Sequence, residues 1–187
     1  MTEITTIPQG KIKLTLAEYL DLPDDGMRYE IYDGDLFMTP APTPQHQSVS
    51  TKLVNKLFIA LQETGKGRIF HAPIDVLLDT HTIVQPDLVF VKKEHFERIG
   101  PRAIEGAPDL VIEILSPSTR RRDVLTKSGL YSRFGVPEYW MVDPEVDRLD
   151  VYRLENGIYA LAGSFSSPAT VRLPGYPEIE LEWLFDR

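Results

Sequence analysis

The order of apolar and polar residues near the start of the chain predicts a short helix followed by a hairpin. The run 14–22 predicts a short helix ahead of the core. From Arg28 to Thr39, two alternating runs flank Asp33-Gly34, a pair that can adopt the positive φ angles of a tight turn. We therefore expect a β-hairpin over these residues.

A longer helix is predicted after this hairpin. Thr43 can cap its first turn, and Pro44 can occupy the first helical position, where its missing N–H costs nothing. An apolar residue then recurs every fourth position and forms a stripe that ends near Gly65: Val49, Leu53, Leu57 and Leu61.

The middle of the chain predicts strands. Two strand-like runs are Phe70 to Leu78, interrupted by Pro73, and Ile83 to Val91. The polar segment 93–106 predicts a short helix and a loop. Pro108 to Leu115 is a nearly continuous apolar run with one carboxylate in it, which is typical of a central strand covered on both faces.

The last third predicts a helix, a buried strand and an antiparallel tail. The helix extends from about Ser118 to Phe134 and ends at Gly135, and the strand follows from Glu138 to Asp143. The remainder alternates as antiparallel strands do. This order predicts an α/β or α+β sandwich, with an N-terminal hairpin and C-terminal antiparallel strands.

Composition adds limits on partners and location. The 187 residues fit one domain over 1–187, with a core of about 26–145 and a C-terminal β extension of about 146–187. The absence of cysteine excludes disulfides, thiolate zinc sites and cysteine nucleophiles. A net charge of −8 disfavours non-specific coating of nucleic acid or anionic lipid, so contact with a polyanion requires a local basic patch. With no signal peptide and no apolar run of about 18 residues, we expect a soluble, cytoplasmic protein with no membrane partner.

Three carboxylates stand within apolar strand segments: Glu30, Asp87 and Glu113. Each could face solvent or pair with an arginine, but an uncompensated buried carboxylate is costly. Magnesium prefers oxygen ligands, commonly one or two carboxylates with waters and phosphate oxygens. Asp87 and Glu113, on neighbouring strands, could supply that arrangement. The four histidines lack the paired spacing of a zinc site: His46, His71, His81 and His95.

The helix predicted after Glu113 carries a lysine on its inward stripe. Lys127 lies among the apolar residues of that stripe: Val124, Leu130, Tyr131 and Phe134. Its side chain could extend to solvent or pair with Asp123. Alternatively its ammonium lies over the carboxylates and orients a nucleophilic water or holds a phosphate. Three arginines near the start of this helix would then contact a nucleic-acid backbone, or they form a solvated face: Arg120, Arg121 and Arg122.

Five blocks of the sequence together resemble the Uma2 family, which belongs to the PD-(D/E)XK restriction-endonuclease-like superfamily. The resemblance extends from about Leu14 to the final LPGYPEIELEWLF. It implies an α/β (α+β) fold with a restriction-endonuclease-like core, in which helices flank a central mixed β-sheet. Its most specific parts are the last two blocks. The blocks, in chain order, are YEIYDGDL, PAPTPQH, VQPDLVFV, PDLVIEILSPST and DVLTKSGLYSRFGVPEYWMVDP.

The resemblance implies an assignment of the catalytic motif. Pro86-Asp87 matches the PD element and Glu113 matches the (D/E) element, while Leu115 stands where the motif has lysine. In similar nuclease families the role of this lysine can move to the following helix, and Lys127 is the residue that would supply it. Asp87 and Glu113 would be metal ligands.

The same resemblance implies roles for three residues outside the motif. Glu30 matches the acidic residue of the Tyr-Glu block and would be a further metal ligand or would position water. His46 matches the histidine near the start of the first core helix and would contact substrate, with a capping or packing role as the alternative. Gln85, next to the PD element, would contact water or substrate.

The implied activity is that of an endonuclease that hydrolyses phosphodiester bonds of DNA with Mg²⁺ or Mn²⁺. Leu115 and the acidic net charge favour two alternatives: a catalytically inert nuclease fold that acts as a binding or scaffold protein, or a hydrolase of another phosphorylated substrate. Nucleases of this superfamily often form dimers. The strands after about Asp147 could therefore form a homodimer interface, or they could only extend and cover the sheet of their own domain.

Overall fold

The computed structural model describes residues 13–23, 25–116 and 122–181. Its first elements are the predicted ones, because α1 (Leu16–Leu20) precedes a hairpin of β1 (Arg28–Tyr32) and β2 (Asp35–Thr39). Asp33 and Gly34 form the turn with φ angles of 50° and 83°, as the Asp-Gly pair predicts.

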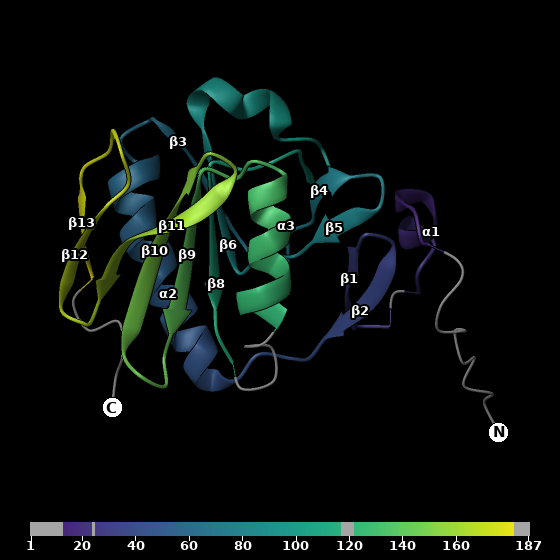
Figure 1. Cartoon of the computed structure of the whole chain (residues 1–187), viewed down its shortest axis with the longest axis horizontal. Helices are drawn as coiled ribbons and strands as arrows, with labels where there is room; N and C mark the ends of the chain where they lie inside the picture. The colour runs from purple at the N-terminus through teal and green to yellow at the C-terminus, as the bar shows by residue number, and fades with distance from the viewer. Residues whose placement is uncertain (1–12, 24, 117–121, 182–187) are drawn as a thin grey trace.

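This hairpin belongs to a five-stranded sheet of order β2-β1-β5-β4-β7. The other members are β4 (Val76–Asp79), β5 (Thr82–Val84) and β7 (Ile104–Glu105). Figure 1 shows this sheet beside the rest of the fold, with α1 at its outer side.

The second sheet has six strands in the order β11-β10-β9-β8-β6-β3. It is mixed, because β8 and β9 are parallel whereas the other neighbours are antiparallel. The apolar run around Glu113 is one of its inner strands, as predicted. The six strands are β3 (Gly67–His71), β6 (Leu88–Lys92), β8 (Leu110–Ile114), β9 (Glu138–Asp143), β10 (Arg148–Glu155) and β11 (Ile158–Phe165).

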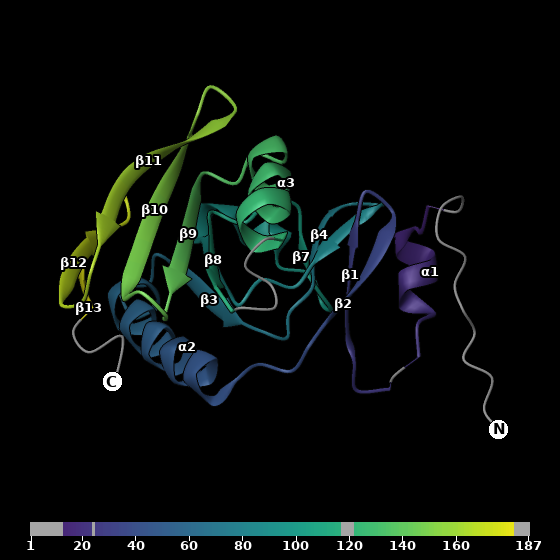
Figure 2. The ribbon, with the colours of Figure 1, turned by 60° about the horizontal axis from the view of Figure 1, so that its bottom comes forward.

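Helices cover both faces of the six-stranded sheet (Figure 2). On one face lies α2 (Pro44–Leu57), capped by Thr43, and it continues as the π-helical segment η1 (Phe58–Gln62). On the other face lie η3 (Arg122–Lys127) and α3 (Ser128–Arg133), which form the described part of the helix predicted from Ser118. A 3₁₀ segment, η2 (Lys93–Arg98), follows β6.

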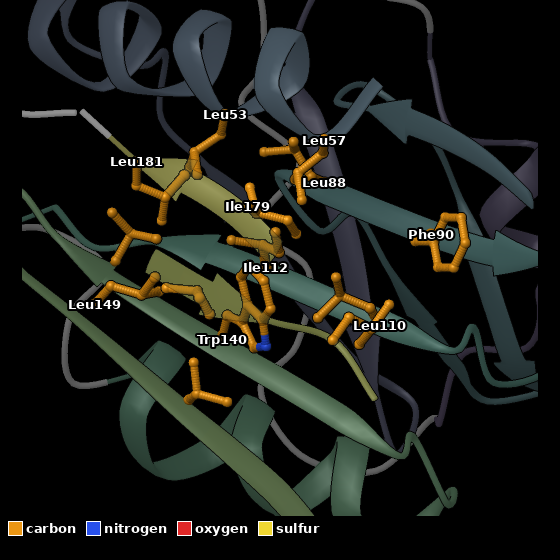
Figure 3. Close-up of a cluster of buried hydrophobic side chains, with 14 of the residues drawn as sticks. Leu53, Leu57, Leu88, Phe90, Leu110, Ile112, Trp140, Leu149, Ile179 and Leu181 are labelled. Carbon is orange, nitrogen blue, oxygen red and sulfur yellow. The ribbon is translucent and has the colours of Figure 1, made fainter. Parts of the chain in front are cut away.

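The tail strands complete the core on the α2 side. β12 (Ala169–Arg172) and β13 (Glu178–Leu181) pair with each other, and β13 contacts α2. Figure 3 shows the resulting cluster, in which α2, the six-stranded sheet and β13 all contribute buried side chains. The labelled members are Leu53, Leu57, Leu88, Phe90, Leu110, Ile112, Trp140, Leu149, Ile179 and Leu181.

A second core cluster, called here the α3-side core, fills the space between α3, the six-stranded sheet and the five-stranded sheet. Residues of opposite parity along β6 and β8 enter the two clusters, as the alternation of side chains along a strand requires. Representative members of the α3-side core are Tyr32, Val76, Val84, Val89, Val111, Leu115, Leu130, Tyr131 and Tyr139.

Each of the two strand-like runs is divided between the two sheets. The run from Phe70 to Leu78 forms the end of β3 in one sheet and β4 in the other, and the run from Ile83 to Val91 forms β5 and β6. Pro73 and Pro86 lie in the connections. Because proline has no N–H to donate to a ladder, it stands where pairing ends and the chain changes sheets.

Within the described ranges, no helix combines the length and the apolar character needed to cross a bilayer.

Candidate active site

Asp87 and Glu113 lie at the same end of the β6–β8 ladder. The last residue pair of that ladder is Leu88 with Ile112. Asp87 is adjacent to Leu88, and Glu113 is adjacent to Ile112, so both carboxylates stand just beyond this pair. The backbone N–H of Ile114 donates to Asp87 Oδ2 at 2.8 Å. This hydrogen bond links β8 to the segment that connects β5 with β6. Both carboxylates are largely buried, with 6% of Asp87 and 3% of Glu113 exposed.

Lys127 reaches Glu113 from the helix that covers this face of the sheet. Its Nζ lies 2.9 Å from Glu113 Oε1, and only 3% of the residue is exposed. Leu115, where the family motif has lysine, packs into the α3-side core together with Val111. Of the two alternatives stated for Lys127, the structure shows the one in which its ammonium lies against a carboxylate.

Tyr131 is a contact of Glu113 that the sequence analysis treated only as a core residue. It follows Lys127 by four residues, and its hydroxyl donates to the same Oε1 atom at 2.7 Å. Burial, followed by the negative charge of Glu113, raises the pKa of the Tyr131 hydroxyl well above its usual value. Tyr131 thus remains a neutral donor at physiological pH. Its place one helical turn from Lys127 is the signal that could have identified it.

Glu30 approaches the same ammonium from the five-stranded sheet. Its Oε1 lies 3.0 Å from Lys127 Nζ and also accepts from the backbone N–H of Gln85 at 2.8 Å. Its Oε2 accepts from the hydroxyls of Tyr32 at 2.6 Å and Thr39 at 3.0 Å. Lys127 therefore bridges Glu30 and Glu113, two carboxylates from different sheets.

The pKa of Glu30 results from opposing effects. Complete burial favours the neutral acid, but the Lys127 ammonium and the hydrogen bonds from Tyr32 and Gln85 favour the ionised form more strongly. The pKa of this carboxyl is consequently lower than its usual value. Glu30 and Lys127 form a buried ion pair at neutral pH.

His46 orients Asp87 from the first turn of α2. Its backbone N–H donates to the Thr43 cap, and its Nε2 lies 3.0 Å from Asp87 Oδ2. The second ring nitrogen, Nδ1, is buried and has no hydrogen-bond partner among the described residues. The histidine implied as a substrate contact is therefore directly linked to the PD aspartate.

Gln85 connects the site to α1. Its side-chain Nε2 donates to Asp75 Oδ1 at 2.8 Å, and the hydroxyl of Tyr19 donates to the same oxygen at 2.8 Å. The Gln85 Oε1 atom is buried without a hydrogen-bond partner in the described part of the chain. Sequence patterns did not single out Asp75 or Tyr19, because their link to Gln85 depends on the long-range fold.

The predicted basic run lies largely outside the described residues. Arg120 and Arg121 lie outside the described residues, as does the side chain of Arg122.

The donor set suits a hard divalent cation. Oδ2 of Asp87 is held by Ile114 and His46, whereas its Oδ1 accepts no hydrogen bond from the described residues. Magnesium commonly takes one or two carboxylates and completes its shell with water and phosphate oxygens, so Asp87 and Glu113 are the residues here that could hold such an ion. Across the described ranges, no three histidine, aspartate or glutamate side chains form a ready-made metal cluster.

The fold of this chain is similar to that of a solved structure. A solved structure from Anabaena variabilis ATCC 29413, described as "a putative nuclease belonging to DUF820", superposes with a TM-score of 0.71 at 24% sequence identity. The match covers 86% of this chain and 89% of that chain. The chain thus shares the α+β fold of that structure.

The family follows from the sequence match. The chain belongs to the Uma2 family, whose model carries the description "Putative restriction endonuclease" and matches residues 16–183. This confirms the resemblance stated on the five sequence blocks. No curated protein matches the chain.

Replacement of Lys127 by methionine tests the buried ion-pair network. Methionine fills similar space but leaves Glu30 and Glu113 without their shared cation, so we expect the free energy of unfolding to fall by about 3–5 kcal/mol at pH 7. Urea denaturation measures this change. The control is Lys92→Met, because Lys92 is more exposed and lies 3.9 Å from Asp109, so its loss should cost less than about 1 kcal/mol. Equal losses in the two variants would contradict the network.

The lowered pKa of Glu30 predicts a pH dependence of stability. The ionised carboxylate stabilises the folded state above the unfolded pKa of about 4.3, and this contribution is lost as the pH falls through the lower folded pKa. In Glu30→Gln, the free energy of unfolding should therefore fall less steeply below about pH 4.3, by up to about 1.4 kcal/mol per pH unit. Urea denaturation between pH 7 and pH 3 measures the two slopes, and identical slopes would refute the assignment.

Proposed function

We propose that this protein is a metal-dependent endonuclease that hydrolyses phosphodiester bonds of DNA, with Mg²⁺ or Mn²⁺ held by Asp87 and Glu113. Membership of the Uma2 family and the nuclease fold support this function. The observation that carries it is the 2.9 Å contact between Lys127 Nζ and Glu113 Oε1. This contact supplies, from the covering helix, the amine that Leu115 does not provide.

The proposed role of Lys127 is electrostatic. Its ammonium is fixed beside the carboxylates before substrate arrives, so it can stabilise negative charge that develops on the phosphate without reorganisation. Tyr131 and Glu113 keep this end of the site in place through their 2.7 Å hydrogen bond.

The proposed role of Asp87 depends on His46 and Ile114. Both residues contact Oδ2 of Asp87. Its Oδ1 would then be the atom that binds the cation. When bound, a divalent ion supplies neutralisation of phosphate charge and acidification of water. His46 and Gln85 are proposed substrate contacts, and Arg120, Arg121 and Arg122 are proposed contacts to the nucleic-acid backbone.

Asp87→Asn tests the proposal with a nearly isosteric change. The amide keeps the size of the side chain but removes the charge, so we expect cleavage of supercoiled plasmid DNA in Mg²⁺ or Mn²⁺ to fall about a hundredfold or more. Gel electrophoresis of nicked and linear products measures the rate.

Asp109→Asn is the matched control. Asp109 is a buried aspartate that contacts His95 at 2.9 Å, as Asp87 contacts His46, but it precedes the opposite end of β8. This control should cleave at the wild-type rate. Cleavage that persists unchanged in Asp87→Asn would indicate a contaminating nuclease and would remove the assignment. Wild-type protein that binds Mn²⁺ but cleaves no DNA would favour the inert fold or a different phosphorylated substrate.

A further inference from the structure

Glu30 has its hydrogen-bonding capacity filled by the protein itself. An ionised carboxylate offers about four acceptor positions. Glu30 uses them for Gln85 N and Lys127 Nζ at Oε1 and for the Tyr32 and Thr39 hydroxyls at Oε2, at distances from 2.6 to 3.0 Å. A cation could bind Glu30 only by displacing one of these donors. Asp87 differs, because among the described residues His46 and Ile114 both contact its Oδ2 and none contacts its Oδ1.

We propose that Glu30 is not a metal ligand but a positioning residue, which holds the Lys127 ammonium against Glu113. This inference rests on the proposed nuclease function. It replaces the ligand role that the family resemblance implies for Glu30 with a role exerted through Lys127.

The elements around Glu30 fix the position of its carboxylate. Tyr32 lies on the same strand and stacks on Phe37, with 4.5 Å between ring centroids, while Thr39 ends the paired strand β2. Gln85, which donates its backbone N–H, is itself fixed to Asp75. Both oxygens of Glu30 are therefore set by the hairpin and by the connection to β6, before Lys127 is considered.

Lys127 needs such an anchor because a lysine side chain has many rotamers. Glu113 contacts the ammonium at 2.9 Å, and Glu30 adds a carboxylate oxygen from the other sheet at 3.0 Å, so the two contacts together restrict where the ammonium lies. Loss of the anchor should lower catalysis while leaving Asp87 and Glu113 able to bind metal. Metal affinity and turnover therefore separate a positioning residue from a ligand.

Glu30→Gln is the decisive variant. Glutamine keeps the length of the side chain and an acceptor for Gln85, and the two hydroxyls can rotate to accept from the new amide. We expect the Mn²⁺ dissociation constant, measured by calorimetry, to stay within about threefold of wild type. The kcat for DNA cleavage should fall about 10–100-fold, as for other residues that orient a catalytic group, with a smaller change in KM.

Two further variants provide reference values for Mn²⁺ affinity and kcat. Asp87→Asn should lose the heat of Mn²⁺ binding. Glu138→Gln makes the same substitution in a buried glutamate paired with Arg153 at 2.7 Å, and its side chain lies with Trp140 on the α2 side of the sheet. It should keep both Mn²⁺ affinity and kcat.

Tyr32→Phe tests the same idea if Glu30→Gln does not fold. It keeps the stacked ring and removes only the 2.6 Å hydrogen bond to Glu30 Oε2. We expect kcat to fall several-fold, with Mn²⁺ affinity unchanged.

The outcomes separate the inference from the proposed function. If Glu30→Gln or Tyr32→Phe weakens Mn²⁺ binding as Asp87→Asn does, Glu30 is a ligand and the inference is overturned while the nuclease assignment stands. Wild-type kcat in Glu30→Gln also overturns it. If wild-type protein neither binds Mn²⁺ nor cleaves DNA, the proposed function fails, and the inference fails with it.

Discussion

Lys127 places its ammonium between two carboxylates that the fold removes almost entirely from water. Ionised Glu30 or Glu113 alone would be costly to bury, and so would Lys127 alone. The 2.9 and 3.0 Å contacts make the three charges mutually dependent, and the hydroxyls of Tyr32, Thr39 and Tyr131 satisfy further lone pairs. This network joins the five-stranded sheet, β8 and the covering helix at one point.

The connection that contains Pro86 places Asp87 near this network. Because the chain leaves β5 in one sheet and enters β6 in the other, Gln85 and Asp87 stand between the two sheets. The backbone of Gln85 then contacts Glu30, and the side chain of Asp87 contacts Ile114. A continuous strand through this segment would have separated these contacts.

Some of this arrangement could be predicted from sequence because local patterns encode it. Carboxylates within apolar strands indicated Glu113 and Asp87, and a lysine on an apolar helical stripe indicated Lys127. The hairpin turn at Asp33-Gly34 and the cap at Thr43 followed from residue types with narrow conformational preferences. The interruption at Pro73 was predicted. That the two parts of each run join different sheets was missed, because an apolar run does not reveal which of two sheets it joins, although Pro73 and Pro86 mark the breaks. The role of Tyr131 was missed because its ring is a core residue and only its hydroxyl reaches Glu113, 18 residues away in sequence.

A crystal structure of the protein soaked in Mn²⁺, with the anomalous signal of manganese recorded, tests the central claim most directly. The account predicts one anomalous peak within coordination distance of Asp87 Oδ1 and a Glu113 oxygen, with Lys127 still in contact with Glu30. At saturating Mn²⁺, no peak between Asp87 and Glu113, or a peak bound to Glu30 in place of Lys127, would contradict it.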